Sequence, residues 1–76
     1  MATFTVQQGK RYRATISLGM IERLATNEMI ADKMRSAGFS EVSVSGSGAL
    51  RVAEAVWSRA DTTGDMPSQV TEVVEV

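Results

Sequence analysis

The stretch RYRATISL, residues 11–18, decides the fold class because its apolar and polar side chains alternate strictly. The apolar set falls on one side of an extended chain and the polar set on the other: Tyr12, Ala14, Ile16 and Leu18 against Arg11, Arg13, Thr15 and Ser17. A period of two is typical of a strand in a sheet with one buried face. The stretch therefore predicts a half-buried strand.

An amphipathic helix is predicted after Gly19, which breaks this strand. Thr26 or Asn27 can cap the start of the helix, which then runs to about Ala37. Its apolar stripe has helical spacing and consists of Met29, Ile30, Met34 and Ala37. We expect Ile30 and Met34 to be core residues that cover the apolar side of the sheet.

The helix is predicted to end at Gly38, with Phe39 packing back against its last turn. Glycine is favoured just beyond a helix because it adopts a positive φ without steric cost. We therefore expect a left-handed backbone at Gly38.

Further strands follow from the same alternation: Thr3–Gln7, Glu41–Ser45, Leu50–Trp57 and Val70–Val76. The turn at residues 46–48 predicts an antiparallel hairpin between the second and third of these. In Leu50–Trp57 we expect Leu50, Val52 and Val56 to point inward. Residues 61–68 are predicted to be a polar loop, and Val70–Val76 to be an edge strand.

The predicted order is β-β-α-β-β-β in a single small domain, residues 1–76. This is an α+β fold, a mostly antiparallel sheet with one helix packed on one face. The strand–helix–strand unit of residues 11–45 is compatible with a right-handed parallel crossover.

The composition argues against an enzyme. The 76 residues include no cysteine and no histidine, which excludes disulfides, thiolate zinc sites and the commonest general base. The segment from Asp61 to Asp65 lacks the alternating ligand series of a calcium loop. We predict a non-enzymatic chain with no cofactor and no metal.

The net charge of −1 gives no overall attraction to nucleic acid, although residues 1–38 carry +3 and residues 39–76 carry −4. Nucleic acid is therefore not predicted as a partner. No apolar run approaches the ~20 residues needed to span a bilayer. No signal peptide is visible, which leaves the compartment open, with the cytoplasm as the default expectation.

The candidate binding surface is the sheet face away from the helix. By alternation we place seven residues on it: Arg13, Thr15, Ser17, Ser43, Ser45, Arg51 and Trp57. Trp57 could stack on a sugar ring or a partner side chain. It could instead complete a second small core, or the face could pair with another subunit.

Residues 12–60 resemble the SPOR domain, a small peptidoglycan-binding module of bacterial cell-division proteins. The resembling stretches are Tyr12–Leu18, the helix ending in MRSAGF at Phe39, Val42–Val44 and Leu50–Arg59. The resemblance implies glycan strands bound across the sheet face just described. The chain departs from the family in lacking a Gln in the first strand and a second helix after the third.

A thin core without cross-links or metal would gain stability from a partner surface. The leading interpretation is a binding or assembly module that forms a homo-oligomer through the uncovered sheet face or the terminal strand edge. The alternatives are a SPOR-like glycan-binding domain and a small structural component of a phage or secretion assembly. Against an oligomer, the N-terminal strand could pair with the terminal strand within one chain.

Overall fold

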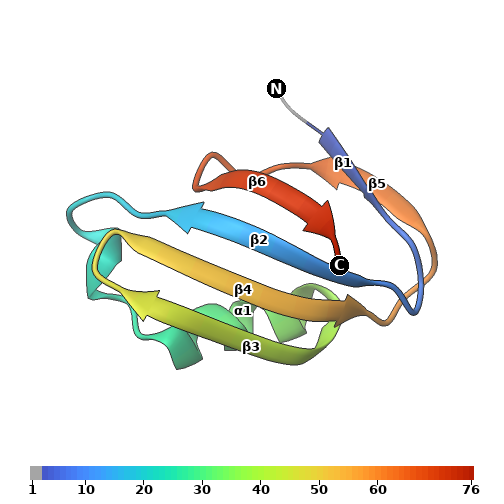
Figure 1. The fold of residues 1–76 in the computed structure, drawn as a ribbon, viewed down its shortest axis with the longest axis horizontal. Helices are drawn as coiled ribbons and strands as arrows, with labels where there is room; N and C mark the ends of the chain where they lie inside the picture. The colour runs from blue at the N-terminus through green and yellow to red at the C-terminus, as the bar shows by residue number, and fades with distance from the viewer. Residues whose placement is uncertain (1–2) are drawn as a thin grey trace.

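The computed structural model describes residues 3–76, and its fold is α+β, as predicted (Figure 1). The elements are β1 (Thr3–Val6), β2 (Arg11–Ser17), the 3-10 turn η1 (Glu22–Leu24), α1 (Asn27–Ala37), β3 (Phe39–Ser47), β4 (Leu50–Trp57), β5 (Thr62–Asp65) and β6 (Val70–Glu75).

The main sheet has four strands in the order β3-β4-β2-β6, and every neighbouring pair is antiparallel. The predicted hairpin between β3 and β4 is confirmed, and β6 lies at an edge, as expected. Strands β2 and β3, which α1 connects, run parallel to each other but are separated by β4. The crossover therefore skips one strand position.

A second sheet has two antiparallel strands, β1 and β5. The prediction of a loop at residues 61–68 is therefore wrong over Thr62–Asp65. This strand was missed because its side chains are all exposed and show no apolar alternation. Backbone pairing and a 2.7 Å hydrogen bond between the hydroxyls of Thr5 and Thr63 hold it to β1. The N-terminal strand consequently does not pair with the terminal strand.

Helix α1 lies on one face of the main sheet, against β3 (Figure 1). The Thr26 hydroxyl caps the helix by accepting a hydrogen bond from the Met29 N–H at 3.1 Å. Ala31 is the buried helical residue, whereas Ile30 and Met34 are only half-buried and Met29 is exposed. The prediction that Ile30 and Met34 are core is wrong in degree, because α1 packs mainly against β3 and does not cover the rest of the sheet.

The helix ends at Gly38, and the expected left-handed backbone is confirmed, with φ at +126°. Its N–H donates to the carbonyl oxygens of Met34 and Arg35, which would otherwise lack partners at the helix end. A Cβ atom at this position would lie 2.8 Å from Arg59 Cδ and 3.0 Å from Trp57 Cη2.

Replacing Gly38 with Ala is therefore expected to destabilise the domain by more than about 1 kcal/mol, because backbone strain and a side-chain clash add together. Gly48→Ala is the matched control, since Gly48 also has a positive φ, +67°, but nothing lies near its missing Cβ. Urea denaturation measures both. Equal losses for the two variants would show that the contact with Trp57 and Arg59 does not matter.

The aromatic core joins the two sheets. Val6 from β1, Tyr12 from β2 and Trp57 from β4 form one buried cluster. The partly buried residues packed against it are Phe4, Phe39 and Val73. The Tyr12 hydroxyl accepts a 2.7 Å hydrogen bond from the Gln7 N–H, so the connection after β1 is also fixed to β2.

Candidate functional site: an apolar groove beside an exposed apolar end

The open face of the main sheet carries most of the residues predicted for it. Cross-strand register places Arg13, Thr15 and Ser17 of β2 on the same side as Ser43 and Ser45 of β3. Between them lie Glu54 and Val52 of β4, because Arg13 and Ser43 both pair with Glu54, and Thr15 and Ser45 both pair with Val52. No helix covers this face (Figure 1).

Arg51 and Trp57 do not belong to this face, and their predicted placement is wrong. Both are buried on the helix side, with 4% and 8% of their surface exposed. The alternation of β4 has the opposite phase to the predicted one, although Leu50, Val52 and Val56 are the more hydrophobic set. Trp57 instead completes the small core with Val6 of the N-terminal strand, in agreement with the alternative interpretation of this residue.

Ion pairs hold both arginines of the open face. Arg13 Nε lies 3.4 Å from a Glu54 carboxylate oxygen, and Arg11 Nη2 lies 3.3 Å from one of Glu41. These pairs are solvent-exposed and contribute little to stability. The face also carries Glu72, which forms no ion pair among the described residues. It is a mixed surface, because three partly exposed valines lie on it as well: Val52, Val56 and Val74.

The helix side of the sheet contains an apolar groove of about 520 Å³. Ala14, Ile16 and Ala53 form its floor, and Ile30, Met34 and Ala37 of α1 form one wall; the opposite wall includes Phe4, Pro67, Val70 and Val73. Four polar residues line it as well: Glu22, Lys33, Asp65 and Gln69. The groove exists because α1 covers only the β3 side of the sheet and the β1–β5 sheet covers the far end.

The groove changes the expectation for Met34. A methionine in a closed core loses about 2–5 kcal/mol on truncation to Ala. Met34 is half-buried and borders an open groove, so we expect Met34→Ala to cost about 1 kcal/mol. Ile16→Ala, at a buried floor position, is the control and should cost at least twice as much in urea denaturation. A Met34 loss equal to the Ile16 loss would mean that the groove is closed in solution.

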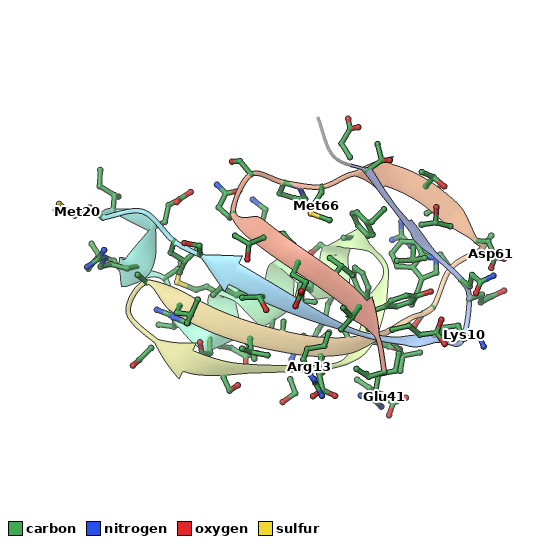
Figure 2. The ribbon with its side chains drawn as sticks, turned by 45° about the horizontal axis from the view of Figure 1, so that its top comes forward. Lys10, Arg13, Met20, Glu41, Asp61 and Met66 are labelled. Atoms are coloured by element: carbon green, nitrogen blue, oxygen red, sulfur yellow. The ribbon has the colours of Figure 1, made fainter. Side chains whose placement is uncertain are left out.

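An apolar end lies beside the groove, where β2 leaves the sheet. Met20, Ile21 and Leu24 are 82%, 82% and 79% exposed. Met29 and Leu50, which are more than half exposed, lie at the same end of the molecule, because the Leu18 N–H bonds to the Ala49 carbonyl and α1 begins there. Figure 2 shows Met20 at the tip of this loop, at the opposite end from Lys10 and Asp61.

Arg51 anchors the base of this loop. Its guanidinium donates to Asn27 Oδ1 at 2.8 Å, to the Arg23 carbonyl at 3.0 Å and to the Gly48 carbonyl at 3.1 Å. One buried side chain thus ties η1 to the start of α1 and to the β3–β4 turn. Asn27 adds a bond from Nδ2 to the Gly46 carbonyl at 3.1 Å.

Glu22 fixes the other side of the loop. Its carboxylate accepts from the Gly19 N–H at 2.8 Å and from the Gln69 side chain. These two bonds, the backbone one first, hold the pKa of the Glu22 carboxyl below its ordinary value. The apolar side chains of residues 20–24 are therefore displayed on a loop that is bonded at both ends.

Within residues 3–76 no three acidic side chains come close enough to hold a metal ion. The described part of the chain also has no helix of the length and apolar character needed to cross a membrane.

Comparison of the chain with protein-family models, with curated proteins and with solved structures found no match. The likeness to SPOR domains therefore stays a prediction.

The groove and the apolar end were both missed by sequence reasoning. The groove depends on where α1 packs on the sheet, and no local sequence pattern predicts that position. The apolar end did leave a signal, because Met20, Ile21 and Leu24 stand between Gly19 and Thr26 without strand or helix periodicity. Large apolar residues in such a connection are typical of a contact surface.

Proposed function

We propose that this domain is a non-catalytic assembly module that associates with further copies of itself. One observation carries the proposal: large apolar side chains of the described residues gather at an exposed end and around an open groove, while the buried core is small. A domain of this size has little apolar burial of its own, so a partner surface adds stability.

The contacts within the chain favour a different surface for self-association from the one predicted from the sequence. Trp57 is buried, so it cannot support association through the open sheet face, and both arginines of that face already pair within the chain. The β6 edge is free among the described strands, but Glu72 and Glu75 place like charges along it. The most exposed large apolar side chains of the described residues are Met20, Ile21 and Leu24, which lie beside the groove.

Sedimentation equilibrium between ~10 and ~100 μM tests the proposal, because mass action makes association depend on concentration. We expect a mean mass that rises above the 8.2 kDa of one chain. A single-chain mass throughout this range would refute self-association. Thr15→Glu, on the open face, serves as a control. If this variant dissociates, the interface lies on the open sheet face, as predicted from the sequence.

Glycan binding is the second candidate, and the polar side chains of the open face favour it. Arg13, Thr15, Ser17 and Ser43 lie together there, which is the arrangement that the SPOR resemblance implies. The face lacks an aromatic platform, because Trp57 lies on the other side. Co-sedimentation with purified peptidoglycan, compared between the wild type and Arg13→Ala, tests it; no retention of the wild type would exclude this function.

A further inference from the structure

We propose that residues 20–24 of one copy, here called the apolar loop, bind in the groove of a second copy, and that the exchange is reciprocal. This inference rests on the proposed self-association and identifies the two surfaces that meet. Each surface lacks a partner within the described chain: the loop side chains are about four-fifths exposed, and the groove is an open apolar cavity.

The two surfaces match in chemistry and size. The apolar loop presents Met20, Ile21 and Leu24, which are flexible or branched aliphatic side chains. The groove is lined mainly by aliphatic and aromatic residues, and its volume of about 520 Å³ falls within the range of about 300–1,000 Å³ typical of pockets that enclose a ligand. The driving force is the removal of both apolar surfaces from water.

The area favours a reciprocal contact. The three exposed apolar side chains of the loop present on the order of 400 Å² of surface, which is comparable to the largest patch on a typical monomer. A standard interface buries about 800 Å² on each partner. One loop in one groove falls short of this, whereas a two-fold dimer, in which each copy gives a loop and receives one, reaches it.

The groove carries one charge of each sign that has no ion pair among residues 3–76, the Asp65 carboxylate and the Lys33 ammonium group. The Arg23 guanidinium on the apolar loop forms no ion pair there either. The proposed docking places Arg23 toward Asp65, which gives it an opposite charge within the interface. Glu22, the other charge on the loop, is already bonded to Gly19 and Gln69 of its own chain.

The loop is pre-organised for binding. Arg51 and Glu22 hold its two sides through hydrogen bonds within the chain. Little conformational entropy is therefore lost when the loop docks, which favours a stable complex of modest area.

Two variants test the pairing without disturbing the core. Ile21→Glu places a charge on the loop at an exposed position. Ala37→Arg places a bulky cation on the groove wall, also at an exposed position, where the helix end favours a basic residue. We expect each variant alone to dimerise at least about tenfold more weakly than the wild type. Unchanged urea-denaturation midpoints at low protein concentration confirm that both remain folded.

Mixing the two variants gives the decisive result. A mixed dimer keeps one intact contact, the loop of Ala37→Arg in the groove of Ile21→Glu, so the equimolar mixture should associate more strongly than either variant alone. Sedimentation velocity with one variant fluorescently labelled measures this, with Thr15→Glu as a control that should behave as the wild type.

Three outcomes contradict the loop-in-groove contact. If Ile21→Glu assembles as well as the wild type, the loop is not part of the interface, while self-association still stands. If each variant dissociates but the mixture does not recover, both surfaces lie in the interface without contacting each other. A wild type that is monomeric at ~100 μM removes the proposed function and this inference together.

Discussion

Trp57→Ala is expected to lower the free energy of unfolding by about 3–5 kcal/mol, the usual cost of removing a buried tryptophan. A domain has only about 5–15 kcal/mol of stability in total, so this one change removes a large part of it. Trp57 belongs to the buried cluster with Val6 and Tyr12. It packs edge-on against Phe39 with ring centroids 4.9 Å apart, and its Nε1–H donates to the Ala60 carbonyl at 2.8 Å.

The Trp57→Ala change removes the packing that connects the two sheets. Val6 carries β1 into the cluster, and β1 in turn holds β5, so both strands of the small sheet depend on this contact. Circular dichroism and urea denaturation measure the effect. Trp57→Phe is the matched control and should retain a cooperative transition, because it keeps the ring contact while losing only the Nε1–H bond and part of the volume.

The opposite result is informative for this residue. If Trp57→Ala unfolds cooperatively within about 1 kcal/mol of the wild type, its side chain is not a core residue. Trp57 would then be the exposed binding residue that the sequence first indicated.

The misplacement of Trp57 shows where sequence reasoning fails in a small sheet. Strand β4 reads LRVAEAVW, and both of its faces contain apolar residues. The larger aliphatic set, Leu50, Val52 and Val56, looked like the core side. The structure buries Ala53 and Ala55 instead, because these pair with Ala14 and Tyr12 and leave space for the tyrosine ring and the helix. Packing between strands decided the phase.

Features with a local cause were predicted correctly. The alternation of β2, the helix of residues 27–37 and the positive φ of Gly38 each follow from a few neighbouring residues. Strand β5 could not be predicted in this way, since TTGD has no apolar pattern and exists as a strand only because β1 pairs with it. The groove likewise depends on contacts between distant segments.

Arg51→Met is expected to destabilise the domain by about 2–3 kcal/mol. The side-chain stem is replaced by one of similar shape, so the loss comes from three hydrogen bonds that the guanidinium makes to Asn27, Arg23 and Gly48. Hydrogen bonds from a charged donor contribute about 1.5–3 kcal/mol each, and relief of the buried charge offsets part of the sum. Arg51→Lys should not restore stability, because an ammonium group cannot reach all three acceptors in their fixed directions.

The residues that lose protection in Arg51→Met distinguish a local effect on the loop from a general loss of stability. Hydrogen exchange should accelerate in residues 18–30, where Arg51 holds η1 and the start of α1, before it accelerates in β1 and β5. The apolar loop then loses its fixed shape, so dimerisation should weaken together with local protection. Arg13→Met is the matched control, since Arg13 forms only an exposed ion pair with Glu54 and should change stability by less than about 1 kcal/mol. If exchange accelerates equally throughout the chain, Arg51 is an ordinary core residue and does not position the loop.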